Sequence, residues 1–428
     1  MTQKNNLKKY CSVATNKKDD NFVGVKGDTN GIEFIFPLGY QLSEEDSDIR
    51  RDVLHLLSIL KEFKDDENKG EVTRRKDFQS KKVDFPFNAY MEIIHYFLEN
   101  GYYKETEPIY KTQSRGKIHW SKTIKSQKPY LIKNSLSKYR PIYTQFTVRR
   151  SAPNEDNEIT RINQFCVYES FSRIGILFSS YMPPKPIGKY DGEGVKNRYL
   201  TLVQDKLANT NNDNKKRLFK AMIEVISSYD GDSDKRFHYG TENFHNVFEK
   251  LIDEMFGIEH KDLYYPKAKW SMKFNKDKRT YPLQPDTIME HENKIFVIDS
   301  KYYKYGNTNE TNDLPQATSI NKQITYAEYA RTLEYCKDKD IYNAFLLPYN
   351  KESDIFPTND LFVNVGEAIG EWRGESSYDY EHIQCILVDI KHLMNNYRSP
   401  TEDDIIQLSD AIMEAFKKKS NFMKIKIF

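Results

Sequence analysis

Hydrophobic residues recur along the chain at helix and strand spacings, and polar turns separate the resulting segments. Apolar runs at 22–25 and 32–36 flank a Gly- and Asn-containing turn, which predicts a hairpin near the N-terminus. Apolar residues at three- to four-residue spacing predict helices over about 48–63, 88–100, 158–178, 214–229, 241–256 and 316–336. Strands are expected at 295–298, 341–348 and 382–392, and a polar loop at 204–213.

The length predicts more than one domain, because a single hydrophobic core rarely serves more than roughly 250–300 residues and the chain has 428. Its best linker is Asp230–Asp234, which is short and acidic and has no apolar residue. We therefore expect an N-terminal α+β region at 1–157, a helical connector at 158–233 and a further domain at 234–428.

Composition indicates a folded protein, since 14% of the residues are aromatic although the mean hydropathy is -0.77. No apolar run approaches the roughly 18 residues of a membrane span, and the first twenty residues lack an apolar signal region. A cytoplasmic protein is expected. Its four cysteines are scattered without a CxxC pair, which argues against a disulfide framework and against a zinc site.

Charge is sorted along the chain, although the formal total is only +2. The basic segment 108–150 contains eleven Lys or Arg residues and no acid. It can follow DNA phosphates, dock an acidic partner subunit or form a solvated face, and the sequence leaves these alternatives open. The residues expected to contact DNA or a partner are Arg115, Lys117, Trp120, Lys122 and Lys125 from this segment, together with Tyr326.

A second hairpin carries the strongest chemical signal in the sequence. Pro285-Asp286 precedes one expected strand, and the apolar run at 295–298 leads directly into Asp299-Ser300-Lys301. If the hairpin turns about Glu292-Asn293, Asp286 lies opposite Asp299, and Lys301 points to the same face. Two carboxylates and a lysine then converge.

Carboxylates this close repel each other unless a cation joins them, and oxygen ligands are those that Mg²⁺ prefers. The register therefore predicts a Mg²⁺ site formed by Asp286 and Asp299, with the backbone carbonyl of Ser300 as a further ligand. Lys301 would orient an attacking water or stabilise charge on a phosphate. The alternative is a surface salt bridge on an edge hairpin, which the preceding apolar strand disfavours.

Two helices complete this arrangement. Glu249 lies on the flank of the apolar stripe of helix 241–256, where it can face the site, or it is an ordinary solvated helix acid. Gln323 and Tyr326 lie on the helix that follows Lys301. Helix, opposed Asp, Asp-x-Lys strand and helix are the sequential parts of a PD-(D/E)xK nuclease core. The expected fold is thus α+β and multidomain, with a C-terminal mixed sheet flanked by helices.

Several spaced motifs extend this resemblance to a family. They are Phe22-Val23-Gly24, Ile35-Phe36-Pro37-Leu38-Gly39-Tyr40, Gly116 to Ile124, Gly240-Thr241-Glu242-Asn243-Phe244, Asp299 to Tyr303 and Lys322-Gln323. Together they resemble the LlaJI-type restriction endonucleases, which are similar to McrC, the nuclease subunit of McrBC systems. The family often has Ala where this chain has Ser300, and a lysine where it has Leu38.

The resemblance implies roles for individual residues. Asp286 and Asp299 would be metal ligands, Lys301 the catalytic lysine, Glu249 the helix acid and a further ligand, and Gln323 a site residue. It also implies an AAA+ GTPase partner of the McrB kind. Because the chain has no Gly-x4-Gly-Lys-[Ser/Thr] loop, GTP would act only through that partner.

The expected function is Mg²⁺-dependent cleavage of double-stranded DNA by a type II, McrBC-like restriction endonuclease. Two alternatives remain at this point. The chain can be a regulatory subunit of nuclease fold that stimulates its GTPase partner without cutting, or a repair or junction nuclease that acts alone.

Overall fold

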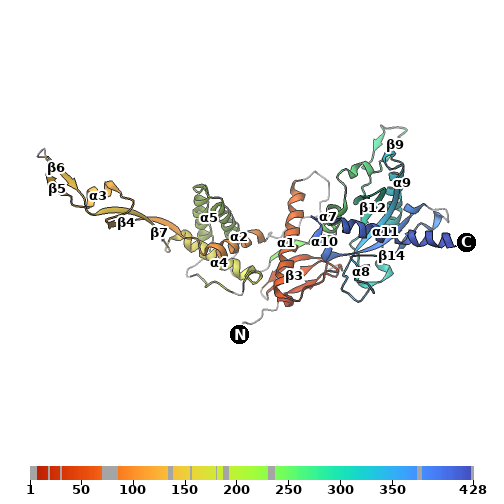
Figure 1. Cartoon of the computed structure of the whole chain (residues 1–428), viewed down its shortest axis with the longest axis horizontal. Helices are drawn as coiled ribbons and strands as arrows, with labels where there is room; N and C mark the ends of the chain where they lie inside the picture. The colour runs from red at the N-terminus through yellow and green to blue at the C-terminus, as the bar shows by residue number, and fades with distance from the viewer. Residues whose placement is uncertain are drawn as a thin grey trace. The chain divides into compact units, whose positions relative to one another are not determined.

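The computed structural model describes residues 7–17, 20–28, 31–69, 85–133, 138–154, 157–179, 181–186, 192–229, 237–373 and 378–425. Eleven α-helices and fifteen β-strands lie within these ranges, so the chain is a mixed α and β protein, as expected (Figure 1). It divides into two compact units. The first unit combines Met1–Ser80 with His238–Phe428, and the second unit is Lys81–Phe237. The expected linker Asp230–Asp234 lies outside the described residues.

This division differs from the expected one, because the N-terminal 80 residues belong with the C-terminal part of the chain and not with the basic segment. Partly buried polar contacts join the two stretches. Lys391 donates to Asp52 at 2.9 Å and to Ser43 at 2.8 Å, and His55 Nε2 lies 2.7 Å from the carbonyl oxygen of Met394. Contacts over some 340 residues of sequence have no local signal, so the sequence pattern could not reveal them.

A five-stranded mixed sheet forms the centre of the first unit, as predicted. Its order is β11 (Thr287–His291), β12 (Lys294–Ser300), β13 (Asp340–Tyr349), β15 (His382–Asp389) and β14 (Phe362–Ile369). β12, β13 and β15 are parallel, whereas β11 and β14 are antiparallel to their neighbours. The sequence pattern missed the edge strand β14, because it is half exposed and lacks a continuous apolar run.

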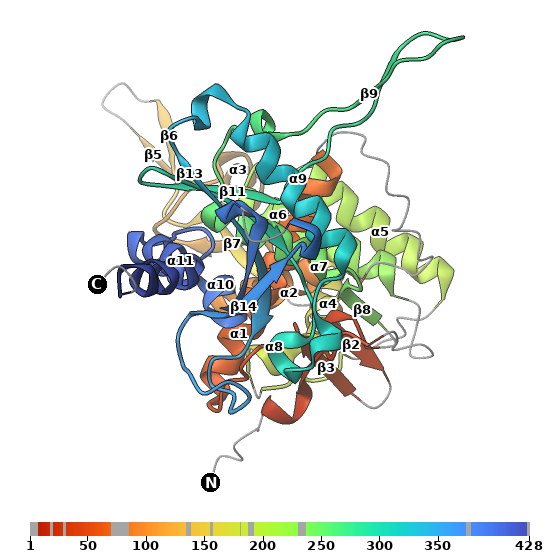
Figure 2. The same ribbon diagram turned by 90° about the vertical axis from the view of Figure 1, so that its right-hand side faces the viewer.

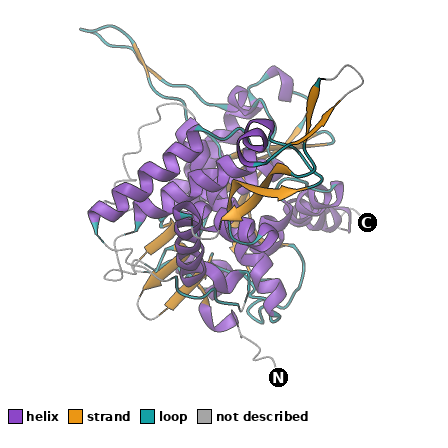
Figure 3. Ribbon diagram, turned by 90° about the vertical axis from the view of Figure 1, so that its left-hand side faces the viewer, coloured by secondary structure: helices purple, strands orange, loops and turns teal. Residues whose placement is uncertain are grey.

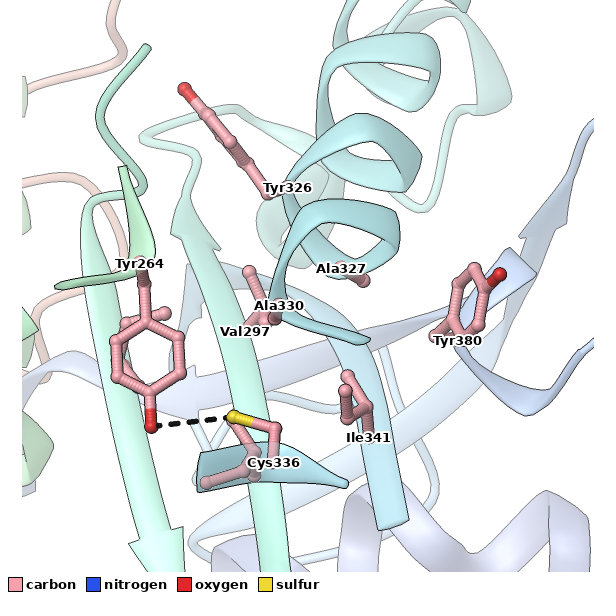
Figure 4. Packing of buried hydrophobic residues seen from close by; sticks show 10 residues of the cluster. Tyr264, Val297, Tyr326, Ala327, Ala330, Cys336, Ile341 and Tyr380 are labelled. Carbon is pink, nitrogen blue, oxygen red and sulfur yellow. Dashed lines mark hydrogen bonds between the residues drawn. The ribbon is translucent and has the colours of Figure 1, made fainter. Parts of the chain in front are cut away.

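Helices cover this sheet on both faces (Figure 2). They are α7 (Phe244–Phe256), α8 (Tyr305–Thr308), α9 (Ala317–Arg331), α10 (Ile390–Asn396) and α11 (Glu402–Ile425). On one face, Ala327 and Ala330 of α9 pack against Val297 in a fully buried cluster (Figure 4). On the other face, Phe296 stacks on Tyr342, whose ring contacts Phe416 of α11. β12 is therefore buried on both sides, as its apolar run predicts.

A four-stranded sheet in the first unit contains the predicted N-terminal hairpin. Its order is β1 (Cys11–Val13), β3 (Gly31–Phe36), β2 (Val23–Asp28) and β8 (Phe237–Thr241), and α1 (Asp46–Lys69) follows it. β2 and β3 pair antiparallel, so the hairpin is confirmed. Leu38, which replaces the lysine expected from the family resemblance, is buried, and its backbone N–H donates to the Tyr302 hydroxyl at 2.6 Å.

The second unit joins a helical core to a long two-stranded ribbon (Figures 1 and 3). Its helices are α2 (Phe87–Asn100), α4 (Glu158–Ile174), α5 (Glu193–Ala208) and α6 (Asp213–Ser228). The prediction of a loop over 204–213 is wrong in part, because α5 extends to Ala208. Only Val203 of α5 is buried, so this helix has almost no apolar stripe to read. None of the described helices is long and apolar enough to cross a membrane.

The ribbon carries the basic segment. It pairs β4 (Glu105–Gln113) with β7 (Phe146–Asn154), and it bears α3 (Trp120–Ser126) and the hairpin of β5 (Tyr130–Lys133) and β6 (Tyr139–Ile142). The sequence pattern did not predict α3. Its seven residues include two lysines and bury only Thr123, so helical periodicity is too short to detect.

The close backbone contact at Gly240 predicts that a larger residue there destabilises the fold. A Cβ at this position would lie 2.1 Å from the Val23 carbonyl oxygen and 2.8 Å from Gly24 Cα, where β8 meets β2. We expect Gly240→Ala to lower the free energy of unfolding by about 1–3 kcal/mol, because backbone atoms would have to move apart. Urea titration checks this. Gly194→Ala in α5 is the control, since nothing lies within 4 Å of that position, and an equal effect of both substitutions would contradict the steric explanation.

Candidate functional site

The hairpin of β11 and β12 has the predicted register. Thr287 pairs with Ile298 and His291 pairs with Lys294, which leaves Glu292 and Asn293 in the turn. Glu292 adopts the left-handed φ of 52° that such a tight turn requires. Continuing the register by one residue beyond β11 brings Asp286 opposite Asp299, so the sequence prediction of their pairing follows the observed ladder.

Asp286, Asp299 and Lys301 come together at the carboxyl end of β12. The Ser300 backbone N–H donates to Asp286 Oδ2 at 2.9 Å. Lys301 Nζ forms an ion pair with Asp299 Oδ2. The Asp299 side chain is only 2% exposed and that of Lys301 16%, so this is no surface salt bridge. The buried carboxylate is held in place by the apolar strand that precedes it.

The charge at Asp286 is unfavourable in this surrounding. Burial, followed by the negative charges of Asp299 and Glu249, raises the pKa of Asp286 to about 8, although the Ser300 N–H and Lys301 act in the opposite direction. A buried carboxyl group whose pKa is raised by neighbouring acids indicates a place where positive charge is lacking. The electrostatic effect of Glu249 also shows that α7 brings its acid toward this hairpin.

The residues present suit a divalent cation. Asp299 Oδ1 is buried and has no hydrogen-bond partner among the described residues, and a bound cation would satisfy it. Among the described residues no group of three or more His, Cys, Asp or Glu side chains is arranged to hold a metal, so Glu249 does not form a three-carboxylate set with the two aspartates. Two carboxylates nevertheless suffice for Mg²⁺, which usually keeps several waters. A ligand role for the Ser300 carbonyl stays a prediction.

A pocket of about 330 Å³ opens beside these residues. It is lined by Asn16, His245, Glu249, Ser300, Lys301, Tyr302 and Tyr303. Glu249 therefore faces the pocket, as its flank position on α7 predicts. Asn16 Nδ2 donates to the Tyr302 carbonyl at 2.8 Å, which brings the N-terminal region to the same pocket. Local sequence patterns could not identify Asn16 as a site residue, because 286 residues separate it from Tyr302.

Two contacts hold the backbone on either side of Pro285. The Tyr326 hydroxyl donates to the Gln284 carbonyl at 2.8 Å, and Lys261 Nζ donates to the Asp286 carbonyl at 2.8 Å while it also pairs with Asp253 of α7. Burial and the charges of Asp299 and Asp286 raise the pKa of Tyr326. Tyr326 thus lies close to the carboxylates and, like Lys261, positions the Asp286 segment. Sequence reasoning missed Lys261.

Gln323 has a different place from the one expected. It is fully buried, and its Nε2 donates to the Val297 carbonyl at 2.7 Å and to Asn343 Oδ1 at 3.2 Å. It does not line the pocket. These contacts tie α9 to β12 and β13, so the observed geometry gives Gln323 a packing role in the sheet.

The predicted contact residues of the basic segment lie in the second unit, on α3 and the turn before it. All five are exposed or half exposed: Arg115, Lys117, Trp120, Lys122 and Lys125. Lys122 Nζ lies 3.2 Å from the centroid of the Tyr110 ring, and the Trp120 ring packs edge-on against Phe146.

Comparisons with known proteins complete this description. A model of the LlaJI restriction endonuclease family matches residues 22–369. Four chains of solved structures are similar to this one. One belongs to a half-complex of Thermococcus gammatolerans McrB AAA+ hexamers with bound McrC, at 13% identity and a TM-score of 0.35, covering 92% of this chain and 83% of that one. No curated protein matches the chain.

The raised pKa of Asp286 predicts how stability changes with pH. Above its ordinary value of 3.8 the unfolded chain releases the proton, whereas the folded, metal-free chain keeps it to about pH 8. Folding therefore loses roughly 1.4 kcal/mol per pH unit over this window through this group. Asp286→Asn does not ionise, so we expect its stability relative to wild type to increase from pH 4 to pH 8 by up to a few kcal/mol.

Urea titrations in EDTA at pH 5, 6.5 and 8 measure this difference. Asp410→Asn on α11 serves as the matched control, because Asp410 is an exposed acid of the same unit. A wild-type to Asp286→Asn difference that stays constant with pH would show that the carboxyl is not buried as described.

The packing role of Gln323 predicts that its substitution lowers the stability of the fold but hardly changes activity. Gln323→Ala removes the donor to the Val297 carbonyl and leaves that oxygen buried, so we expect a loss of about 1–3 kcal/mol in unfolding free energy. Well below the unfolding temperature, cleavage should remain within about threefold of wild type. A large loss of cleavage without loss of stability would instead support the site role that the family resemblance implies.

Proposed function

The chain belongs to the LlaJI restriction endonuclease family, and we propose that it is the Mg²⁺-dependent nuclease subunit of a McrBC-like, type II restriction system that hydrolyses phosphodiester bonds in double-stranded DNA. The convergence of Asp286, Asp299 and Lys301 at the end of one buried strand carries this proposal. We assign these residues to a PD-(D/E)xK site, because the opposed aspartate, the Asp-x-Lys strand and the flanking helices occur in the order of that core.

Each residue has a defined task in this proposal. Asp286 and Asp299 would hold the cation, and Mg²⁺ bound there would polarise the scissile phosphate and lower the pKa of the attacking water. Lys301 lines the pocket, where it stabilises negative charge developing on the phosphate. Glu249 faces the same pocket from α7 and can accept a proton from water or orient it.

A partner supplies GTP hydrolysis in this proposal. The chain has no Gly-x4-Gly-Lys-[Ser/Thr] loop, and its spaced motifs resemble those of McrC-like subunits. We therefore expect a McrB-like AAA+ GTPase to act with it on DNA. The exposed cations of the second unit are available to DNA or to this partner.

Cleavage of plasmid DNA with the AAA+ partner, GTP and Mg²⁺ tests the proposed function. We expect Asp299→Asn to reduce cleavage at least about 100-fold because a ligand of the cation is weakened. Lys301→Ala should have an effect of similar size, because the positive charge that stabilises the reacting phosphate is removed. EDTA should abolish cleavage, and Asp410→Asn should leave it unchanged. Wild-type cleavage by Asp299→Asn would refute the site. Stimulation of the GTPase without any cutting by wild type would favour a regulatory subunit.

A further inference from the structure

A narrow two-stranded arm projects from the first unit directly before the site (Figure 2). We call residues 266–283 the basic arm. Its strands are β9 (Lys269–Trp270) and β10 (Lys278–Arg279), which pair Lys269 with Arg279 and Trp270 with Lys278. The Thr280 N–H donates to the Ala268 carbonyl at 2.9 Å, which extends the pairing toward the base of the arm.

The arm carries a dense and uncompensated positive charge. Its six cations are Lys267, Lys269, Lys273, Lys276, Lys278 and Arg279, and Asp277 is its single acid. The Asp277 carboxylate accepts from the Ser271 hydroxyl at 3.2 Å and from the Met272 N–H at 3.3 Å. Within the described residues, none of the six cations forms an ion pair. Lys269 opposite Arg279 places like charges side by side, which disfavours the isolated arm and favours an anionic partner.

Large aromatic side chains alternate with these cations and remain in solvent. Trp270 is 62% exposed, Phe274 89% and Tyr281 90%. Aromatic rings stabilise a fold through burial of about 150–250 Å² each, but Phe274 and Tyr281 are almost unburied here and Trp270 is buried over less than half of its surface. Interleaved cations and exposed aromatics match the chemistry of a nucleic acid, whose phosphates attract the cations and whose sugars and bases cover the rings.

The base of the arm is attached to the site itself. Leu283, where the arm ends, lies three residues before Asp286, and Tyr326 and Lys261 fix the carbonyls of Gln284 and Asp286 at 2.8 Å each. At about 3.3 Å per residue, each side of the arm reaches roughly 25–30 Å, comparable with one turn of duplex DNA at about 34 Å. A two-stranded ribbon also fits the major groove, which is about 12 Å wide.

We propose that the basic arm binds double-stranded DNA and holds the duplex against the Asp286, Asp299 and Lys301 site. This proposal rests on the proposed nuclease function, because attachment of the arm to Asp286 favours the substrate of that site over an acidic protein. Its cations contact the phosphates on either side of a groove, and Trp270, Phe274 and Tyr281 pack against the sugars and base edges.

Binding without cleavage tests the arm in the full-length chain. The background is Asp299→Asn in EDTA, and the probe is a fluorescent 30-base-pair duplex whose dissociation constant is measured by anisotropy from 50 to 300 mM KCl. The arm variant adds Lys269→Gln, Lys278→Gln and Arg279→Gln. We expect at least tenfold weaker binding at 100 mM KCl, and a slope of log K against log salt that is smaller by about 2–3, because about three phosphate contacts are lost.

A matched control keeps the charge change but moves it elsewhere on the first unit. Lys61→Gln, Lys337→Gln and Lys417→Gln remove three exposed lysines, and binding should stay within about twofold. Phe274→Ala with Tyr281→Ala should weaken binding while the salt slope stays constant, since no ionic contact is removed. This second variant separates ring contacts from net charge.

The outcomes separate this inference from the proposed function. Equal binding by the background and the arm variant, an equal loss in the control, or no duplex binding at all would overturn the arm as a DNA site. Loss of the AAA+ partner with retained DNA binding would also overturn it. Arm-dependent binding in a wild-type chain that never cuts would leave the inference standing and refute the nuclease. DNA cleavage that the arm substitutions leave unchanged would support the nuclease function and refute the arm as a DNA-binding site.

Discussion

Two carboxylates that share one buried hairpin impose the main constraint on the first unit. Burial, followed by the repulsion between Asp286 and Asp299, raises the pKa of Asp286 to about 8. The arrangement persists because Ile295 to Ile298 are fully buried on both faces of the sheet, which fixes the strand that ends in Asp299. Lys301 and the Ser300 N–H offset part of the negative charge. A folded protein that retains two buried carboxylates so close together has a site at which a bound cation would balance the negative charge.

Hydrogen bonds from neighbouring elements hold the backbone of the segment that carries Asp286 in place. Tyr326 from α9 and Lys261 from the turn after α7 hold the two carbonyls that flank Pro285, at 2.8 Å each. The N-terminal region also contacts this site, since Asn16 donates to the Tyr302 carbonyl and the Leu38 N–H to the Tyr302 hydroxyl. Asn16 and Tyr302, which are 286 positions apart, line the same pocket. This explains why the first 80 residues belong to the same compact unit as the hairpin.

Local patterns predicted the parts of this structure that local physics determines. The pairing of Asp286 with Asp299 follows from a two-residue turn and a period of two, and the pocket-facing position of Glu249 follows from a period of 3.6. The remaining parts depend on packing. The hydrogen bonds of Gln323 to Val297 and Asn343 exist only once α9 lies on the sheet, so the sequence could name the residue but not its surroundings. The basic arm escaped notice because its strands have two residues each and no apolar alternation.

The formal charge of +2 is a sum over groups that lie in different parts of the molecule, with cations on the basic arm and buried carboxylates at the site. In the arm, six cations stand within eighteen residues beside one acid, and none of them pairs with a carboxylate in the described part of the chain. A few residues further on, Lys301 pairs with one oxygen of Asp299, whereas the other, Oδ1, is buried without a hydrogen-bond partner in the described part of the chain. If the cations of the arm formed ion pairs with Asp286 and Asp299, the two sets of charges would balance within the chain. Neither the arm nor the aspartates would then attract a charged ligand. Because the arm and the aspartates do not pair with each other, the cations of the arm can attract a polyanion and the carboxylates can attract a metal ion. A phosphate of the bound DNA would then lie beside the metal ion and next to Lys301.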